Sequence, residues 1–223
     1  MVKNSKCKIC RRLGVKLFLK GERCLTQKCP MVKRSYPPGQ KKKRRTRALS
    51  EYGEELREKQ KLKKWYNLEE RQFRKYVKKI LESHQGGKKD VLISLIKTLE
   101  SRLDNVVFRL GIAASRPQAR QLISHGHFLV NAKPVDIPGY LVKKGDKIRI
   151  SPSSRKKNIF QNLPTLLKTH KTPSWLELNF EKPSTRAKLG AGLGLEGKVI
   201  GAPSLEEAVP PAEVSLIFEY YSR

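Results

Sequence analysis

The sequence predicts an α+β fold, and three observations lead to that prediction. The first 50 residues carry all four cysteines and a strong positive charge but almost no apolar core. Residues 50–125 contain apolar side chains at helical spacing, and residues 128–150 contain short β-prone runs separated by turn sequences. We therefore expect a basic N-terminal segment over 1–48 and a helical domain over 49–100 and 151–223, with a C-terminal extension. A small module over 101–150 is inserted between the two parts of the helical domain. We expect this module to contain two helices and a hairpin-rich antiparallel sheet.

The charge of the chain indicates a polyanionic partner. Lys and Arg number 49 against 20 acidic residues, which gives a net charge of +29. Residues 1–50 alone hold 17 basic residues and one acidic residue, a net of +16. The positive side chains of such a chain repel one another until a polyphosphate neutralises them. A membrane surface is the competing polyanion, but no apolar run approaches the roughly 20 residues that a spanning helix needs. The first residues show no secretory signal, so we expect a cytoplasmic protein without a membrane partner.

The four cysteines have the spacing of a metal site. Cys7, Cys10, Cys24 and Cys29 form the pattern C-x2-C-x13-C-x4-C, and no cysteine follows in the chain. Two thiolates from a tight turn and a second pair about a dozen residues later can complete a tetrahedron around one structural zinc ion. Two disulfides or a redox pair are the alternatives. Disulfides would need an oxidising compartment, and a redox motif should lie beside a strand–helix–strand unit.

Capping signals and apolar spacing predict the helices of the middle region. Ser50 can cap a helix that runs to about Lys64, and Asn67 with Glu70 forms a capping box for the next one. That helix presents one apolar stripe, made of Phe73, Tyr76, Val77, Ile80 and Leu81. A further helix is expected from Asp90 to Gly111, with Leu92, Leu95, Ile96, Leu99, Leu103, Val106 and Leu110 as its core face.

The last part of the inserted module reads as a short helix and small strands. Ser115 and Gln118 form another capping box, with Pro117 in the first turn, and the helix ends at His125–Gly126. Strands are expected at 128–130, 134–135, 140–142 and 147–150. Gly192 to Gly197 spells G-x-G-x-x-G, but the surrounding prolines leave no room for a dinucleotide-binding unit, so we expect a flexible loop there.

Several segments together resemble one known family. The segments 102–111 (RLDNVVFRLG) and 115–127 (SRPQARQLISHGH), continued through 136, closely resemble the bacterial small-subunit ribosomal protein four family. The similarity extends to residues 56–61, 70–74, 173–177 and 216–223, and the cysteines resemble those of its zinc-bearing branch. The chain departs from the family at the Asn131–Ala132 turn, where the family has Asn-Gly, and in a segment from about Glu181 to Gly194 that has the look of an insertion. Its C-terminal region is also rich in Pro and Glu.

This resemblance implies a structural constituent of the small ribosomal subunit. Members of the family bind small-subunit rRNA at a multi-helix junction and nucleate assembly of the subunit body. They lie near the channel through which mRNA enters, beside proteins three and five, and influence decoding accuracy together with proteins five and twelve. Some repress their own operon. The alternatives are an RNA-modifying enzyme with the same module, as in pseudouridine synthases, and a free RNA-binding stress factor. The enzyme would need a catalytic domain, for which the residues after 150 leave little room.

Basic side chains are the candidates for RNA contact, because Lys and Arg neutralise phosphates and Arg can also stack on bases. In the module, Arg116 and Arg120 lie one helical turn apart and could span adjacent phosphates. Arg102 and Arg109 could equally form internal ion pairs, for example with Asp104. The full set of candidates is Lys41, Lys42, Lys43, Arg44, Arg45, Arg47, Arg57, Lys61, Arg71, Arg74, Arg102, Arg109, Arg116, Arg120, His125 and Lys133.

Overall fold

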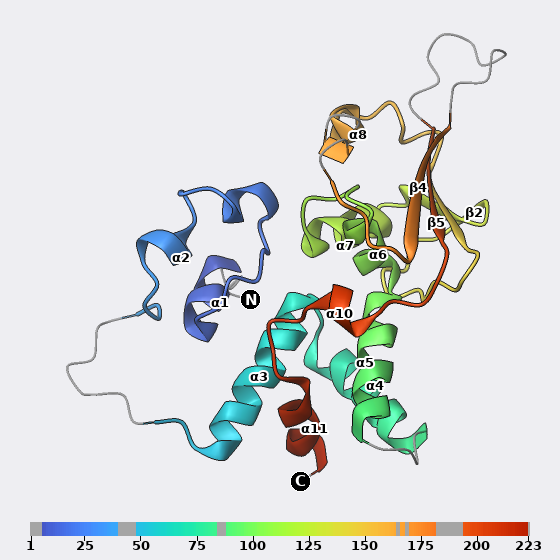
Figure 1. Ribbon diagram of the computed structural model, residues 1–223. Helices are drawn as coiled ribbons and strands as arrows, with labels where there is room; N and C mark the ends of the chain where they lie inside the picture. Colours follow the sequence, from blue (N-terminus) through green and yellow to red (C-terminus); the bar gives the residue numbers. More distant parts are fainter. Residues whose placement is uncertain are drawn as a thin grey trace, which may run out of the picture. The chain divides into compact units, whose positions relative to one another are not determined.

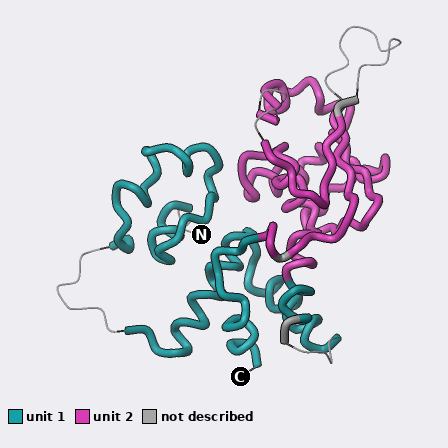
Figure 2. Tube along the Cα trace, viewed as in Figure 1, with its two compact units in different colours: residues 1–95, 209–223 teal, residues 96–208 magenta. Residues whose placement is uncertain are grey.

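The computed structural model describes residues 6–39, 48–83, 88–163, 166–167, 170–181 and 194–222 (Figure 1). The chain forms two compact units (Figure 2). The first unit contains residues 1–95 and 209–223, and the second contains residues 96–208. The mixture of helices with an antiparallel sheet confirms the α+β class. The division into 1–48, 49–100 with 151–223, and 101–150 stays a prediction.

The cysteine-bearing segment folds as three short helical pieces, α1 (Lys6–Leu13), η1 (Gly21–Cys24) and α2 (Pro30–Lys33). Gly14 and Gly21 both have positive φ and lie at the turns between α1 and η1. Leu17 and Leu19 are buried between these two glycines.

Three helices follow in the first unit: α3 (Glu51–Trp65), α4 (Glu70–Ser83) and the C-terminal α11 (Val214–Ser222). Ser50 caps α3 as predicted, since its hydroxyl accepts a hydrogen bond from the Gly53 N–H at 3.3 Å. The capping box predicted for α4 is wrong. Asn67 has a left-handed φ of 55°, and the Glu70 side chain turns to Lys59 and Lys63 instead of the backbone.

The predicted apolar stripe of α4 forms the core of this unit. Phe73, Val77 and Ile80 are buried, whereas Leu81 lies at the exposed edge of the stripe. The C-terminal helix α11 packs along α3, with Ile217 fully buried.

The long helix expected from Asp90 to Gly111 is in fact two helices, α5 (Lys88–Glu100) and α6 (Leu103–Arg109). The break falls at Arg102, whose φ of −71° and ψ of 139° are extended. The backbone there pairs with another segment: the Ser101 carbonyl accepts from Val142 N–H at 2.9 Å, and Arg102 bridges to Leu141. The apolar spacing continues across the break, which is why it suggested one helix.

The second unit places α6 and α7 (Arg116–Ser124) against one face of a five-stranded antiparallel sheet (Figure 1). Ser115 is the N-cap of α7, but its side chain makes no cap hydrogen bond; Gln118 Oε1 instead accepts from Ala114 N–H at 3.0 Å. The helix stops at His125, followed by Gly126 with φ 70°, as predicted.

The sheet has the order β2-β1-β3-β5-β4. Strands β1 (Phe128–Val130) and β3 (Lys147–Ile150) were predicted, and β2 (Lys133–Pro134) begins one residue earlier than expected. Residues 140–142 do not form the expected strand; Leu141 makes only the isolated bridge to Arg102.

Both central residues of the hairpin turn between β1 and β2 have left-handed backbone conformations. Asn131 and Ala132 have φ of 49° and 65°, so Ala132 adopts a left-handed conformation at the position where the family has Gly. The Asn131 side chain fixes the turn, because it donates to Asp146 Oδ1 at 2.8 Å and accepts from the Lys147 N–H at 3.0 Å.

The region after residue 150 contains strands that the prediction of a helical domain did not include. Its described helices are α8 (Asn158–Gln161), α10 (Leu205–Ala208) and α11, and its strands β4 (Leu176–Glu181) and β5 (Gly194–Val199) complete the sheet. The expected flexible loop over the glycine pattern is wrong from Gly194 onward. Gly197 is needed in β5 because a Cβ there would lie 2.5 Å from Leu110 Cδ1. The core of the supposed insertion, residues 182–193, lies outside the described residues.

Candidate nucleic-acid interface

Arg102 is buried in the interior of the second unit. The prediction that it contacts RNA is therefore corrected. Its side chain is buried, with Nε donating to Asp104 Oδ1 at 3.1 Å and Nη2 to Oδ2 at 2.6 Å. This two-pronged pair is the ion pair that the sequence left open as an alternative. A buried guanidinium in such a pair holds the turn between α5 and α6 and leaves no donor fork facing solvent.

A second ion-pair network centres on Glu100, the last residue of α5. This carboxylate is almost fully buried and accepts from Arg109 Nε at 2.9 Å, Arg109 Nη2 at 3.1 Å and Asn105 Nδ2 at 2.8 Å. Arg109 also donates to the Ala208 carbonyl at 3.0 Å, which ties α10 to α6. Arg109 is therefore mainly structural, with only a fifth of its side chain exposed.

Arg116 belongs to the same network. Its Nε donates to Asn105 Oδ1 at 2.7 Å, its guanidinium lies 4.6 Å from the Phe108 ring centroid, and Nη2 is 4.0 Å from Glu100 Oε1. The side chain is buried, so the prediction that Arg116 and Arg120 span adjacent phosphates fails for Arg116. Arg120 is half-buried one turn further along α7.

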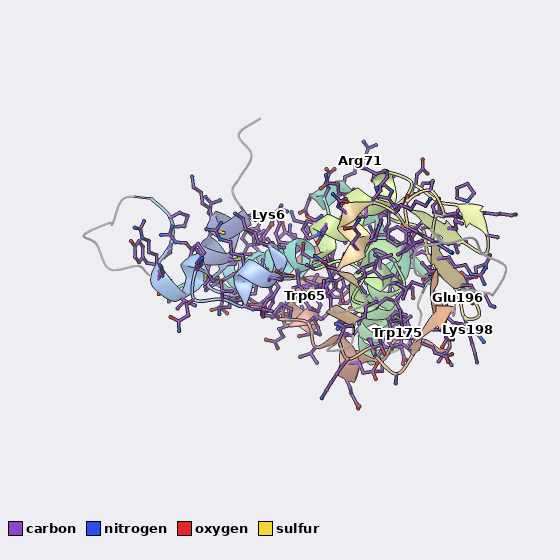
Figure 3. The ribbon with its side chains drawn as sticks, turned by 90° about the horizontal axis from the view of Figure 1, so that it is seen from above. Lys6, Trp65, Arg71, Trp175, Glu196 and Lys198 are labelled. Atoms are coloured by element: carbon purple, nitrogen blue, oxygen red, sulfur yellow. The ribbon has the colours of Figure 1, made fainter. Side chains whose placement is uncertain are left out.

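The remaining candidates divide by exposure. Arg57 donates to the Leu13 carbonyl at 3.0 Å, and Lys61 pairs with Glu58, so both are engaged within the first unit. The basic run from Lys41 to Arg47 lies outside the described residues. Among the candidates that the structure describes, five are exposed, and one of them, Arg71, is labelled in Figure 3: Arg57, Arg71, Arg74, His125 and Lys133.

The two histidines near the end of α7 take different roles. His127 is buried, with Nδ1 2.8 Å from Ser154 Oγ and its ring packed edge-on against Phe160. Burial lowers its pKa, and the positive charge of Lys157 and the neighbouring His125 lower it further. His127 is thus a neutral packing residue, whereas His125 is exposed. Sequence reasoning missed Lys157, although the run Arg155-Lys156-Lys157 was visible in the sequence.

The outer face of the sheet carries a charged cluster that the sequence analysis also missed. Glu196 of β5 pairs with Lys147 at 3.1 Å and with Arg149, both on β3. Burial alone would raise the pKa of Glu196, but the hydrogen bonds from Arg149 and Lys147 lower it. Glu196 and the exposed Lys198 lie next to each other on β5 (Figure 3). Strand alternation, once β5 is known, places these side chains opposite the core face.

All four cysteines carry free thiols and line one small pocket. Cys10, Cys24 and Cys29 are buried and Cys7 is half-buried. Burial raises the pKa of the Cys10 thiol, a backbone hydrogen bond from Leu17 opposes that effect, and the other three cysteines add to it. Even so, the described part of the chain contains no group of three or more His, Cys, Asp or Glu side chains arranged to hold a metal ion. The geometry therefore does not establish the predicted zinc site.

None of the helices in the described ranges combines the length and apolar character that crossing a membrane requires. Two family models match the chain. Residues 1–97 match the ribosomal protein S4/S9 N-terminal domain, and residues 101–148 match the S4 domain.

Curated relatives match almost the whole chain. The chain is 46% identical over 217 residues to the small ribosomal subunit protein uS4 of Thermoanaerobacter sp. strain X514, covering 97% of this chain and 96% of that protein. It is 45% identical over 217 residues to uS4 of Halothermothrix orenii and 44% identical over 218 residues to uS4 of Thermus thermophilus, with the same coverage. The chain belongs to the small ribosomal subunit protein uS4 family.

Proposed function

We propose that this protein binds small-subunit rRNA directly, as an early partner that nucleates assembly of the subunit body. As a uS4 family member it is a structural component of the small ribosomal subunit, located with the ribosome in the cytoplasm, and it is not an enzyme. The alternative of an RNA-modifying enzyme is therefore wrong. The observation that carries the proposal is the near full-length identity of about 45% to bacterial uS4 proteins.

The exposed side chains support electrostatic binding to RNA. The chain has a net charge of +29, and most of the lysines and arginines in its described ranges face solvent once the internal pairs of Arg102, Arg109 and Arg116 are set aside. Each phosphate that such a side chain neutralises releases a counterion, so the affinity should fall steeply with salt. We infer that Arg71, Arg74, Arg120, His125, Lys133 and the run Lys41–Arg47 carry these contacts.

Contacts with other ribosomal components belong to the same proposal. We infer neighbours corresponding to small-subunit proteins three, five and twelve, and a location near mRNA where it enters the subunit, with an influence on decoding accuracy. The support is the family membership.

We also propose that the four cysteines hold one structural zinc ion. They converge on one pocket from α1, from the end of η1 and from the residue before α2. The Lys20 N–H lies 3.4 Å from Cys24 Sγ, a backbone donor of the kind that stabilises thiolates. Bound zinc would keep the thiols ionised and fix a segment with little core. Elemental analysis should find one zinc per chain, and Cys10→Ser should lose it; zinc-free protein with an unchanged melting curve would refute the site.

Sedimentation and binding test the main proposal. The protein should co-migrate in stoichiometric amounts with small subunits in high-magnesium gradients, and a predominantly free pool would favour a free RNA-binding factor instead. Purified protein should bind structured small-subunit rRNA much more tightly than heparin or random duplex. Equal affinity for all three would refute specific rRNA binding.

A further inference from the structure

A pocket in the first unit is lined by aromatic side chains rather than by a run of basic ones. Its walls are Tyr52 of α3, Glu70 and Arg74 of α4, and Tyr220 and Tyr221 of α11. Its volume of about 370 Å³ falls within the range of roughly 300–1,000 Å³ typical of small-ligand sites. Three segments distant in sequence thus build one concave surface.

Tyr52 presents an open ring surface and lies next to Tyr220. Tyr52 is 49% exposed although it lies in the first turn of α3. Its ring centroid lies 5.5 Å from that of Tyr220, with the planes tilted by 32°, and the two hydroxyls are 3.4 Å apart. The exposed Tyr52 ring, supported by the half-buried Tyr220, offers a flat apolar face to a stacking ligand.

The floor of the pocket is held rigid by a buried lysine. Lys59 is 4% exposed, its Nζ lies 4.1 Å from the Tyr220 ring centroid, and it donates to Glu70 Oε1 at 2.8 Å. The Tyr221 hydroxyl donates to the same oxygen at 2.9 Å. The Tyr220 and Tyr221 rings and the Glu70 carboxylate are therefore held in place before any ligand arrives, which reduces the entropy lost on binding.

Glu70 gives the pocket a hydrogen-bond acceptor. Burial alone would raise its pKa, but hydrogen bonds from Lys59, Lys63 and Tyr221 lower it to about 2, so the group is charged at neutral pH. These three donors leave about one of the roughly four acceptor positions of a carboxylate, and 44% of the side chain remains exposed. The open position suits an N–H donor.

The signs of charge at the pocket restrict its ligand. An acidic peptide would meet Glu70, and a basic peptide would meet Arg74, which is exposed at the rim. A ligand with a neutral aromatic ring, an amino group on one edge and a phosphate nearby satisfies both side chains at once. A nucleotide in an unpaired region of RNA has all three features.

We propose that this pocket binds one unpaired rRNA base, an adenine or a cytosine, through its exocyclic amino group. The base stacks on Tyr52, its amino group donates to Glu70, and Arg74 contacts the adjoining phosphate. This inference rests on the proposed rRNA binding and adds a site that recognises a base rather than the backbone.

The test uses the full chain and small-subunit rRNA, with filter binding for affinity and dimethyl sulfate probing of adenines and cytosines. Tyr52→Ala should weaken binding about tenfold, as expected for the loss of one stacked base, without changing the salt slope. One adenine or cytosine protected by the wild type should become reactive. Tyr52→Leu should behave like Tyr52→Ala, and Tyr52→Phe should restore both affinity and protection because it keeps the ring.

The matched control is Tyr140→Ala, which removes an exposed tyrosine outside the pocket and should leave both readouts unchanged. Normal affinity and protection with Tyr52→Ala and Tyr52→Leu would overturn the proposal while leaving rRNA binding intact. The proposal would also be overturned if these Tyr52 variants lost a crosslink to a neighbouring ribosomal protein while their RNA footprint stayed unchanged, because the pocket would then contact protein and not RNA. If the wild type failed to bind the rRNA specifically, the proposed function would fall first.

Discussion

Replacing Glu100 with Gln tests whether the buried network around it stabilises the second unit. The change keeps the shape of the side chain but removes the charge that Arg109 contacts through two hydrogen bonds and that Arg116 approaches at 4.0 Å. Both guanidiniums, one of them buried, would then lose the countercharge of Glu100. Removing one partner of a buried ion pair costs about 3–5 kcal/mol. Because the amide oxygen can still accept one hydrogen bond, we expect about 3 kcal/mol.

Thermal unfolding followed by circular dichroism measures this loss. At roughly 3–4 °C per kcal/mol for a unit of this size, Glu100→Gln should lower the melting temperature by about 10 °C. The matched control is Glu82→Gln, which removes a surface pair with Lys78 at 3.6 Å. An exposed pair contributes little, so that variant should melt within about 2 °C of the wild type.

The outcome separates two roles for the arginines of this segment. If Glu100→Gln melted like the wild type, the ion pairs would not stabilise the fold, and Arg109 and Arg116 would again be candidates for phosphate contact. If it melted early but bound rRNA with an unchanged salt slope once the folded fraction was taken into account, the structural role would be supported.

Three further predictions concern single positions. Arg116→Ala should lower stability without altering the salt slope of rRNA binding, whereas Arg120→Ala should reduce that slope by about one. Equal slopes for the two variants would contradict the inference that only Arg120 contacts a phosphate. The depressed pKa of Glu70 means that its pairs add stability above pH about 4.5 and lose it as the pH falls towards about 2. Because the side chain is 44% exposed, this amounts to about 1 kcal/mol after screening. The stability gap between wild type and Glu70→Gln in urea titrations should therefore shrink in acid, and a constant gap would refute it. Gly111→Ala should destabilise by about 1–3 kcal/mol, because φ is +77° and the new Cβ would lie 2.6 Å from His170 Cδ2; an unchanged melting temperature would contradict this.

Local signals predicted the elements whose boundaries are set locally. Ser50 begins α3, Gly126 follows the end of α7, and the alternation in 147–150 marks β3, because each depends on residues within one or two turns. The Asn131–Ala132 turn, by contrast, depends on a more distant contact. Its left-handed geometry is held by contacts between Asn131 and Asp146, a distant partner that the turn sequence does not contain.

Features set by distant contacts could not be predicted. The apolar spacing from Leu99 to Leu103 continues through the break at Arg102, and only pairing with residues 141–142 shows why the helix stops. Strand β5 forms because it adds to the edge of β3, and β4 forms because it adds to β5. Both sequences contain residues such as Glu, Gly and Asn that are unusual in isolated strands.

The candidate RNA contacts failed where arginines were chosen by sequence position rather than by environment. A planar guanidinium can grip a carboxylate as well as a phosphate, and nothing local distinguishes the two uses. In the second unit the guanidinium groups of Arg102 and Arg109 each bind a carboxylate. Arg116 donates to the side-chain amide of Asn105, which lies beside the Glu100 carboxylate. The choice depends on Asp104 and Glu100 being buried within reach, which only the fold determines.

This division of arginines shifts the expected phosphate contacts of the second unit towards lysine. Lys133, Lys143, Lys144, Lys156 and Lys157 are all exposed, whereas the arginines in the most family-like segment are buried or mostly so. An ammonium group at the end of a flexible chain follows an irregular RNA backbone without needing a fixed angle of approach. The salt slope contributed by this unit should therefore track the number of exposed lysines removed. Substituting Arg102 or Arg109 should instead act through folding, because their charge is already matched inside the protein.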